Sequence, residues 1–200
     1  MGAYNGKKAC GIVFYVVLFA IVLGCGGIRY SRVAPDIADF HPKTIGVLPV
    51  DVGTHGEARR MVDRIFADVL AETGWFSSVA LPEEIQKEVV TDDVLRKAMV
   101  EYLTKLKTVN FSDPDLSNMI GKGYSIESFV VVVVDFWDYT MQGEDKVAKV
   151  GFSLTLVDAP TGKIIWEAGH HEVEDYWLIK PDRGKLGRTV ARLLVAEMPH

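Results

Sequence analysis

Hydrophobic residues after residue 42 recur first at helical spacing and later at strand spacing. Lys43–Val50 is a short apolar run that predicts a buried strand. Over Ala58–Leu70, apolar residues then return every three or four positions, which predicts a helix that ends at Gly74. Thr54 and Glu57 have the spacing of a capping box at the start of this helix.

The chain between residues 75 and 125 predicts a second short strand followed by further helices. Trp75–Leu81 is typical of a strand, and Pro82 is well placed to begin an acidic helix. Apolar residues over Val94–Leu106 share one face of the next helix, which begins near Thr91. Asp113-Pro114 then precedes a shorter helical pattern.

Strand spacing dominates after residue 128. Phe129–Val134 is apolar and mostly β-branched, as is typical of a strand that is covered on both faces. Val150–Leu156 alternates apolar with polar or small residues, and the turn Ala159–Gly162 leads into a returning strand over Lys163–Asp175. A last helix follows Pro181.

These elements predict one domain of the α/β (α+β) class over residues 43–200. Its mixed sheet has about five strands flanked by helices, and the three C-terminal strands are largely antiparallel. Trp166 alternates with Ile164 and Ala168 on one face of the returning strand. We therefore expect its indole in the core, against the helix that carries Phe66.

The first 24 residues have the organisation of a signal peptide. Lys7 and Lys8 precede an apolar run over Ala9–Leu23, which is shorter than the about 20 residues that a spanning helix needs. Val22–Cys25 resembles the bacterial lipobox, the motif at whose cysteine a lipoprotein is lipidated and cleaved. An uncleaved signal anchor and an ordinary signal peptide remain the alternatives, and both place the domain outside the cytoplasm.

This interpretation divides the chain into a lipoprotein signal peptide (1–24), a lipid anchor with its tether (25–42) and the domain. A lipidated Cys25 carries acyl chains such as palmitate, which hold a protein on a membrane. Gly26 stands where an inner-membrane retention signal usually has Asp. Resemblance to Gram-negative sorting therefore favours the inner leaflet of the outer membrane, facing the periplasm.

Charge and cysteine content change this picture little. The formal net charge is −5, and removal of the signal peptide, which has two lysines and no acidic residue, makes the chain more acidic. Such a balance does not favour nucleic acid as a partner. The chain has two cysteines, and cleavage removes Cys10, so the mature domain has to fold without a disulfide.

A family resemblance follows from three segments: the opening strand Thr44–Val50, the helix after it, and the hairpin Leu156–Glu167. Together they resemble the domain shared by curli-secretion lipoproteins, by lipoprotein activators of penicillin-binding proteins and by several uncharacterised bacterial lipoproteins. The similarity covers roughly residues 43–199. It implies a mixed sheet flanked by helices, a role as an envelope assembly or accessory protein, and no catalytic residues.

Candidate metal ligands occur at His170, His171 and Glu172. Neighbouring residues of a strand point to opposite faces, so the two histidines cannot hold one ion, whereas His170 and Glu172 share a face. We predict strand-end histidines in a polar setting, with no metal site and no cofactor. Thr161–Ile164 lacks the first glycine of a phosphate-binding loop and continues as a strand.

Four acidic residues gather near one end of the central strands: Asp135, Asp138, Glu144 and Asp145. They lack the spacing of an EF-hand calcium loop. We expect a solvated hairpin end.

Two groups of residues predict a surface for a protein partner. Trp137 and Tyr139 share an alternate face of the central strand, where exposed aromatic side chains would make a contact patch. Lys185, Arg188 and Arg192 lie on one side of the last helix, away from its apolar positions, where anionic lipid or an acidic partner could meet them. The alternatives are a flanking helix that covers the aromatic pair and a basic stripe that is merely solvated.

The anchor and the resemblance predict a non-catalytic, lipid-anchored periplasmic protein that supports the assembly or activity of envelope machinery. An envelope protein is its expected partner, and the sequence leaves the homo-oligomeric state open. One alternative is an envelope-associated hydrolase with His170, Glu172, Asp135 and Asp138 as its candidate residues. A structural or ligand-carrying lipoprotein is the other.

The lipobox interpretation makes Cys25 the first residue of the mature protein. We expect Cys25→Ser to leave the protein unlipidated, because no other residue of the motif has a thiol to acylate. Mass spectrometry of the protein from its native membrane checks this, with a lipid mass expected on a peptide that begins at Cys25. Detection of an unmodified peptide that still contains Lys7 would contradict the assignment.

Overall fold

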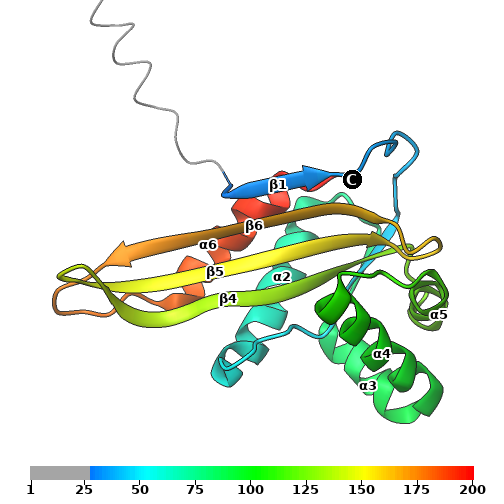
Figure 1. The fold of residues 1–200 in the computed structure, drawn as a ribbon, viewed down its shortest axis with the longest axis horizontal. Helices are drawn as coiled ribbons and strands as arrows, with labels where there is room; N and C mark the ends of the chain where they lie inside the picture. The colour runs from blue at the N-terminus through cyan, green and yellow to red at the C-terminus, as the bar shows by residue number, and fades with distance from the viewer. Residues whose placement is uncertain (1–27) are drawn as a thin grey trace, which may run out of the picture.

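A computed structural model describes residues 28–200, apart from the side chains at 86 and 88–91. Figure 1 shows a long sheet with helices on both sides of it. In chain order the elements are β1 (Tyr30–Val33), β2 (Thr44–Val47), η2 (Gly56–Ala58), α2 (Arg59–Thr73), β3 (Ser78–Ala80), α3 (Pro82–Thr91), α4 (Asp93–Val109), α5 (Pro114–Tyr124), β4 (Ser128–Gln142), β5 (Asp145–Asp158), β6 (Ile164–Asp175) and α6 (Arg183–Ala196). Within residues 28–200, no helix is both long and apolar enough to cross a membrane.

The strands form one mixed sheet in the order β1-β6-β5-β4-β2-β3. β2 runs parallel to β3 and β4, whereas antiparallel pairings join β4 to β5, β5 to β6 and β6 to β1. The predicted fold class, a mixed sheet flanked by helices with antiparallel C-terminal strands, is confirmed. Phe129–Val134 lies in β4, which has β5 on one side and β2 on the other.

Strand β1 lies in the segment that was predicted to be a tether, and it is a sixth strand where about five were expected. It pairs with β6 from Tyr30 opposite Gly169 to Val33 opposite Trp166. All four of its side chains are exposed, so no hydrophobic alternation marks the segment as a strand. Because free backbone groups at the edge of β6 decide its structure, the folded domain includes β1 and does not begin at residue 43.

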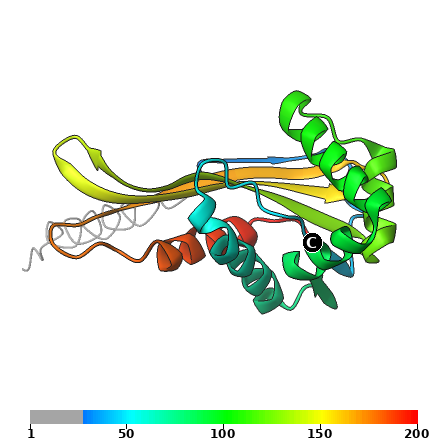
Figure 2. The same ribbon diagram turned by 90° about the horizontal axis from the view of Figure 1, so that it is seen from below.

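Helices cover the two faces of the sheet unequally, as Figure 2 shows. α2 and α6 pack on one face, where the apolar core includes Phe66, Phe152 and Trp166. α3, α4 and α5 gather at one end of the other face, around a second apolar cluster that includes Tyr102 and Phe129. The remainder of that second face has none of the described helices over it.

Aspartates begin three of the helices. The side chains of Asp92, Asp113 and Asp182 accept hydrogen bonds from backbone N–H groups in the first turns of α4, α5 and α6. The capping box predicted at Thr54 is wrong, because the short helix η2 intervenes and α2 has no side-chain cap. Gly74 ends α2 in the left-handed conformation, with φ of 69°, as a helix stop at this position predicts.

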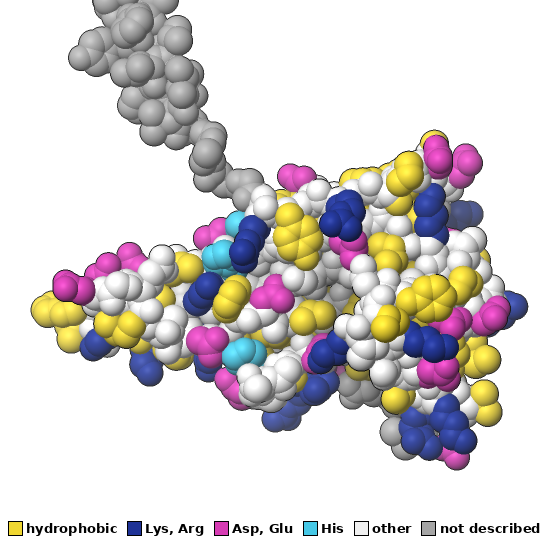
Figure 3. Space-filling view, in the orientation of Figure 1, with side chains coloured by type: hydrophobic (Ala, Val, Ile, Leu, Met, Phe, Trp, Pro, Cys, Tyr) yellow, Lys and Arg dark blue, Asp and Glu magenta, His cyan; other side chains and the backbone are white. Residues whose placement is uncertain are grey.

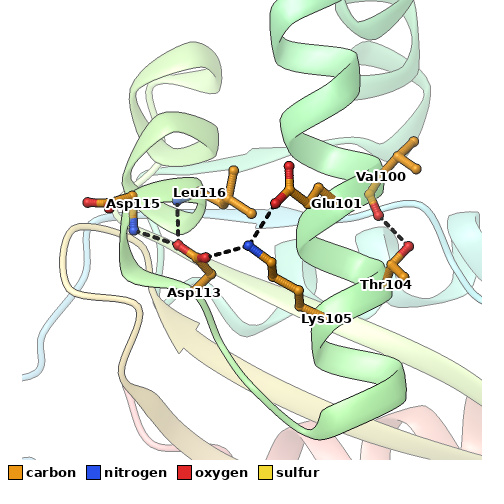
Figure 4. A network of polar contacts seen from close by, with 7 residues as sticks. All are labelled: Val100, Glu101, Thr104, Lys105, Asp113, Asp115 and Leu116. Carbon is orange, nitrogen blue, oxygen red and sulfur yellow. Dashed lines mark hydrogen bonds and ion pairs between the residues drawn. The ribbon is translucent and has the colours of Figure 1, made fainter.

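A polar network joins α4 to the start of α5 (Figure 4). Lys105 Nζ donates to Glu101 Oε1 at 2.7 Å and to Asp113 Oδ2 at 2.8 Å. The other carboxylate oxygen of Asp113 accepts the backbone N–H groups of Asp115 and Leu116. Hydrogen bonding to Lys105 lowers the pKa of Asp113, so this cap stays ionised well into the acidic range.

Three long strands extend beyond the helices. β4, β5 and β6 have 15, 14 and 12 residues and project together on the left of Figure 1. Their far end consists of the β4–β5 turn and the segment between β6 and α6, which we call the sheet tip (residues 141–146 and 176–180). The sheet tip and the helices α3–α5 therefore lie at opposite ends of the molecule.

Two tryptophans lie in the core on the α2/α6 side. Trp166 is fully buried, and its Nε1 donates to Ser31 Oγ of β1 at 2.8 Å. Its predicted core position, in one cluster with Phe66, is confirmed. Ile164 does not share its face as expected, because the β5–β6 register shifts between Leu156 and Val157 and Ile164 packs with the second cluster. Trp137 of β4 is also buried, with 2 % of its surface exposed.

Truncation of either buried tryptophan is expected to destabilise the fold strongly. Trp166→Ala and Trp137→Ala should each lower the free energy of unfolding by about 3–5 kcal/mol, because each leaves a large cavity. Trp177→Ala is the matched control, since Trp177 is 84 % exposed and its loss should change stability by about 0.5 kcal/mol or less. Denaturant melts of the three variants check this, and a Trp137→Ala variant as stable as Trp177→Ala would contradict the placement of Trp137.

Candidate functional site

The uncovered part of the sheet has a shallow hollow of about 490 Å³, which we call the open-face pocket. It faces the viewer in Figure 3, between the projecting end of the sheet and the helices on the right. Strands β1, β4, β5 and β6 all contribute to its lining: Arg29, Tyr30, Asp135, Phe136, Ser153, Gly169, His170 and His171. The pocket therefore depends on β1, the strand that the sequence did not predict.

A β-bulge in β4 positions Asp135, the acidic residue of this pocket. The β4–β5 register shifts between Val134 and Phe136, so Asp135 has no partner residue on β5 and is exposed. Ser153 Oγ of β5 donates to Asp135 Oδ2 at 2.7 Å, and Tyr30 Oη donates to Ser153 Oγ at 3.3 Å. The three side chains form a chain of hydrogen bonds across β4, β5 and β1.

An aromatic and cationic group borders the same pocket. Lys149 Nζ lies 3.5 Å from the centre of the Phe136 ring, and the His171 ring meets that ring edge-on at 5.5 Å between centres. Gly151 permits this approach, since a Cβ there would lie 2.7 Å from His171 Cβ and 2.9 Å from Phe136 Cδ2. Burial, and then the positive charge of Lys149, lower the pKa of His171 from its usual 6.5.

His170 and Glu172 share a face of β6, as predicted, and it is the face opposite to His171. His170 Nε2 and Glu172 Oε1 are 2.9 Å apart, and His170 Nδ1 is buried with no hydrogen-bond partner among the described residues. Phe152, which pairs with His170 across the strands, belongs to the α2/α6 core. Within residues 28–200, no group of three or more His, Cys, Asp or Glu is arranged to hold a metal ion.

The four acidic residues predicted near one strand end do not form one site. Asp135 lies in the open-face pocket, whereas Asp138 Oδ1 is 3.6 Å from His55 Nδ1 in the loop before η2. Glu144 and Asp145 are exposed at the sheet tip. Of the residues that the hydrolase alternative would need together, Asp135 and His170 both line the open-face pocket, whereas Asp138 lies apart from them, beside His55.

Trp137 is not part of a partner surface, which corrects the sequence-based expectation. The bulge at Asp135 shifts the alternation of β4, so the indole turns to the α2/α6 side and lies 6.2 Å from Phe152 between ring centres. Gly187 of α6 lies against it, and a Cβ on Gly187 would be 3.0 Å from the indole. The alternative that a helix covers Trp137 is therefore the correct one.

Tyr139 is half-buried, and its contacts lie within the domain. Its hydroxyl donates to the carbonyl oxygen of Pro181 at 2.7 Å, and the Arg183 guanidinium lies 4.6 Å from its ring centre. Arg183 Nη1 also donates to the carbonyl oxygen of Trp137 at 2.5 Å. These contacts hold the segment after β6 against the far part of β4.

The predicted basic stripe on α6 faces the acids of α2. Arg188 forms ion pairs with Asp68, at 3.4 Å, and with Glu72, and Arg192 Nη2 is 3.2 Å from Glu72 Oε2. Hydrogen bonds from Arg192 and Arg188 lower the pKa of Glu72. Lys185 is exposed and has no described ion pair, so it is the member of the stripe that stays open to a partner.

A groove beside α4 extends the hollowed surface toward the helices. It has a volume of about 500 Å³, and its apolar lining includes Leu103, Val131 and Val133. Lys107 Nζ and Asp51 Oδ2, 2.5 Å apart, close one side of it. Thr155 of β5 lies in this groove two residues along the strand from Ser153, so the groove and the open-face pocket are neighbours on one face.

Sequence reasoning missed the most exposed apolar residues of the domain. Trp177, Leu178 and Ile179 are consecutive between β6 and α6, and all three are largely exposed. In the sequence, the feature that could have revealed them is a run of three large apolar residues that fits neither the period of the strand before it nor that of the helix after it. Cys25, the predicted lipidation site, lies outside the described residues, as does the predicted signal peptide.

Comparison with known proteins identifies the fold but not a family. No family model and no curated protein matches the chain. A solved PelC dodecamer from Paraburkholderia phytofirmans is similar with a TM-score of 0.51 and 12 % identity, over 84 % of this chain and 93 % of that chain. Lipoprotein GNA1162 from Neisseria meningitidis follows with 0.46 and 19 %, over 78 % and 97 % of the two chains. Protein XCC0632 from Xanthomonas campestris has 0.41 and 10 %, over 83 % and 87 %.

The lowered pKa of His171 is a measurable property of the open-face pocket. We expect its imidazole to titrate below pH 6.5, because burial and the nearby positive charge of Lys149 disfavour the charged form. As pH falls through 6.5, the unfolded state binds this proton more readily than the folded state, so stability decreases. Lys149→Gln should raise the pKa of His171, and Lys122→Gln on α5 should not.

An NMR titration of the ring protons measures this pKa in the three proteins. A midpoint for His171 at or above 6.5 in the unsubstituted protein would contradict its placement in the pocket.

Proposed function

We propose that this chain is a lipid-anchored accessory protein of the bacterial cell envelope, which binds a partner and does not catalyse a reaction. The observation that carries the proposal is the lipobox-like Val22–Cys25 directly after a short apolar run. The similarity to PelC extends over 84 % of this chain and concerns the fold alone. An anchor of acyl chains needs no further membrane-spanning element.

The arrangement of the open-face pocket favours binding. The Ser153 hydroxyl donates to the Asp135 carboxylate, so it is not placed as a nucleophile whose proton an imidazole could accept. His171 packs edge-on against Phe136, and Lys149 lies over the same ring. Aromatic, cationic and acidic groups on a shallow surface are typical of protein contacts. In a hydrolase, by contrast, the catalytic groups have to converge on one reacting atom.

The proposed location is the inner leaflet of the outer membrane, with the domain in the periplasm. Gly26 supports this through the sorting pattern of Gram-negative lipoproteins. The proposed role is support of envelope assembly or of envelope enzymes, by analogy with the lipoproteins that Thr44–Val50 and Leu156–Glu167 resemble. The PelC comparison structure is a dodecamer, so a second copy of the chain is one partner that the experiment has to distinguish.

Photo-crosslinking in the intact envelope tests the open-face pocket as the partner surface. A photoreactive phenylalanine analogue is placed at Tyr30, which is 47 % exposed at the pocket, in the full-length lipidated protein. We expect a discrete adduct with an envelope protein, and we expect Lys149→Glu to abolish it by reversing the charge beside Phe136. The analogue at Phe111, which is 50 % exposed in the loop after α4, is the matched control and should give no such adduct.

The mass of the adduct identifies the partner. An adduct of two copies of this chain would assign the surface to self-association, and an adduct with a different envelope protein would support the accessory role. Absence of any Tyr30-specific adduct would refute the open-face pocket as a binding surface.

A further inference from the structure

The segment between β6 and α6 presents three consecutive apolar side chains to solvent. Trp177, Leu178 and Ile179 are 84 %, 79 % and 85 % exposed, and we call them the apolar loop. Met141, 55 % exposed, lies in the other part of the sheet tip. Apolar side chains are visible at the left end of the molecule in Figure 3, beyond the helices. Contiguous exposed residues of this size mark a surface that meets a membrane or another molecule.

Both ends of the apolar loop are fixed to the domain. Before it, the backbone N–H of Tyr176 donates to the carbonyl oxygen of Lys146 at 2.9 Å, and the Tyr176 ring meets the Tyr139 ring at 5.9 Å between centres. After it, the carbonyl oxygen of Pro181 accepts the Tyr139 hydroxyl. The contacts on either side keep the three apolar side chains directed outward at the sheet tip.

The N-terminal end of β1 is directed toward this same end of the sheet. β1 is antiparallel to β6, with Tyr30 opposite Gly169, so from Val33 back to Tyr30 the strand runs in the direction in which β6 approaches the sheet tip. β6 continues six residues from Gly169 to Asp175, which spans about 20 Å at about 3.3 Å per residue. The five residues from Cys25 to Tyr30 can span at most about 18 Å. A fully extended segment can therefore bring the acylated cysteine to about 2 Å short of the level of Asp175, the last residue of β6 before the sheet tip.

We propose that the apolar loop enters the interface of the bilayer that holds the lipidated Cys25. The inference rests on the proposed lipid anchor, and it adds a second contact between this chain and the membrane. Trp177 suits the boundary between headgroups and acyl chains, because its indole combines a large apolar surface with one N–H donor. Leu178 and Ile179 add apolar area that no other described element covers.

Charge at the sheet tip identifies the kind of lipid surface. At the sheet tip and the last two residues of β6 taken together, acidic residues outnumber basic ones, with Glu144, Asp145, Glu174 and Asp175 against Lys146 and Lys180. Attraction to anionic lipid therefore does not drive membrane binding at the sheet tip. Insertion of apolar surface drives it. The partner is a zwitterionic lipid surface, and the addition of anionic lipid to it should not increase binding of the apolar loop.

Two contacts at one end of the molecule would orient the domain. A single acyl anchor leaves a domain free to rotate about its tether, whereas a second contact at the sheet tip fixes the long axis of β4–β6 toward the membrane. Helices α3–α5, at the other end, then face away from the bilayer. The open-face pocket lies between the two ends, at a defined height above the membrane.

Tryptophan quenching by brominated lipid tests this proposal in the full lipidated protein. The protein is reconstituted into phosphatidylcholine vesicles with and without brominated acyl chains. We expect brominated chains to reduce the emission of the unsubstituted protein, and we expect Trp177→Phe to lose most of that reduction. Trp75→Phe is the matched control and should keep it, because Trp75 stacks on His200 at 3.7 Å at the end opposite the sheet tip.

The outcomes separate this inference from the proposed function. Mass spectrometry of the same sample reports whether Cys25 carries lipid, and its absence would overturn the anchor on which the inference rests. If Cys25 is lipidated and Trp177→Phe is quenched as strongly as the unsubstituted protein, the apolar loop does not enter the bilayer, while the proposed function stands. Protection of Trp177 from aqueous iodide without quenching by bromine would also overturn the inference and would indicate a protein contact.

Discussion

The antiparallel pairing of β4 with β5 and of β5 with β6 is the constraint on which the rest of the structure depends. These pairings continue for the whole length of three long strands, so they define a rigid axis that extends beyond the helices. The helices pack where the strands are apolar, and the sheet tip projects where they are not. The open-face pocket and the groove beside α4 lie on one face of this axis, and the sheet tip lies at its end.

One residue, Asp135, divides those surfaces. Its bulge shifts the alternation of β4, which buries Trp137 under α6 and turns Phe136 to the open face. Glycine completes the arrangement on both sides, since Gly187 admits the indole and Gly151 admits the rings of Phe136 and His171. A strand without the bulge would carry Trp137 on the uncovered face, with a large apolar side chain exposed and a gap under α6.

The position of β1 links the fold to the proposed membrane contact. Because β1 pairs with β6 in the antiparallel sense, its N-terminal end is directed toward the end of the sheet that carries the apolar loop. The same strand contributes Tyr30 to the open-face pocket through its hydrogen bond with Ser153. A segment that resembles a simple tether in sequence thus takes part in both proposed contacts, one with lipid and one with a protein partner.

Local hydrophobic pattern determined most of the elements of this protein, because the periods of helices and strands depend only on near neighbours in the chain. It predicted the fold class, the stop at Gly74 and the buried Trp166. Three features came only from tertiary structure. β1 forms because the edge of β6 offers free backbone groups, the bulge at Asp135 follows from pairing with β5, and the exposure of Trp177 follows from where β6 ends. Each depends on residues distant in sequence, so no period along the chain could reveal it.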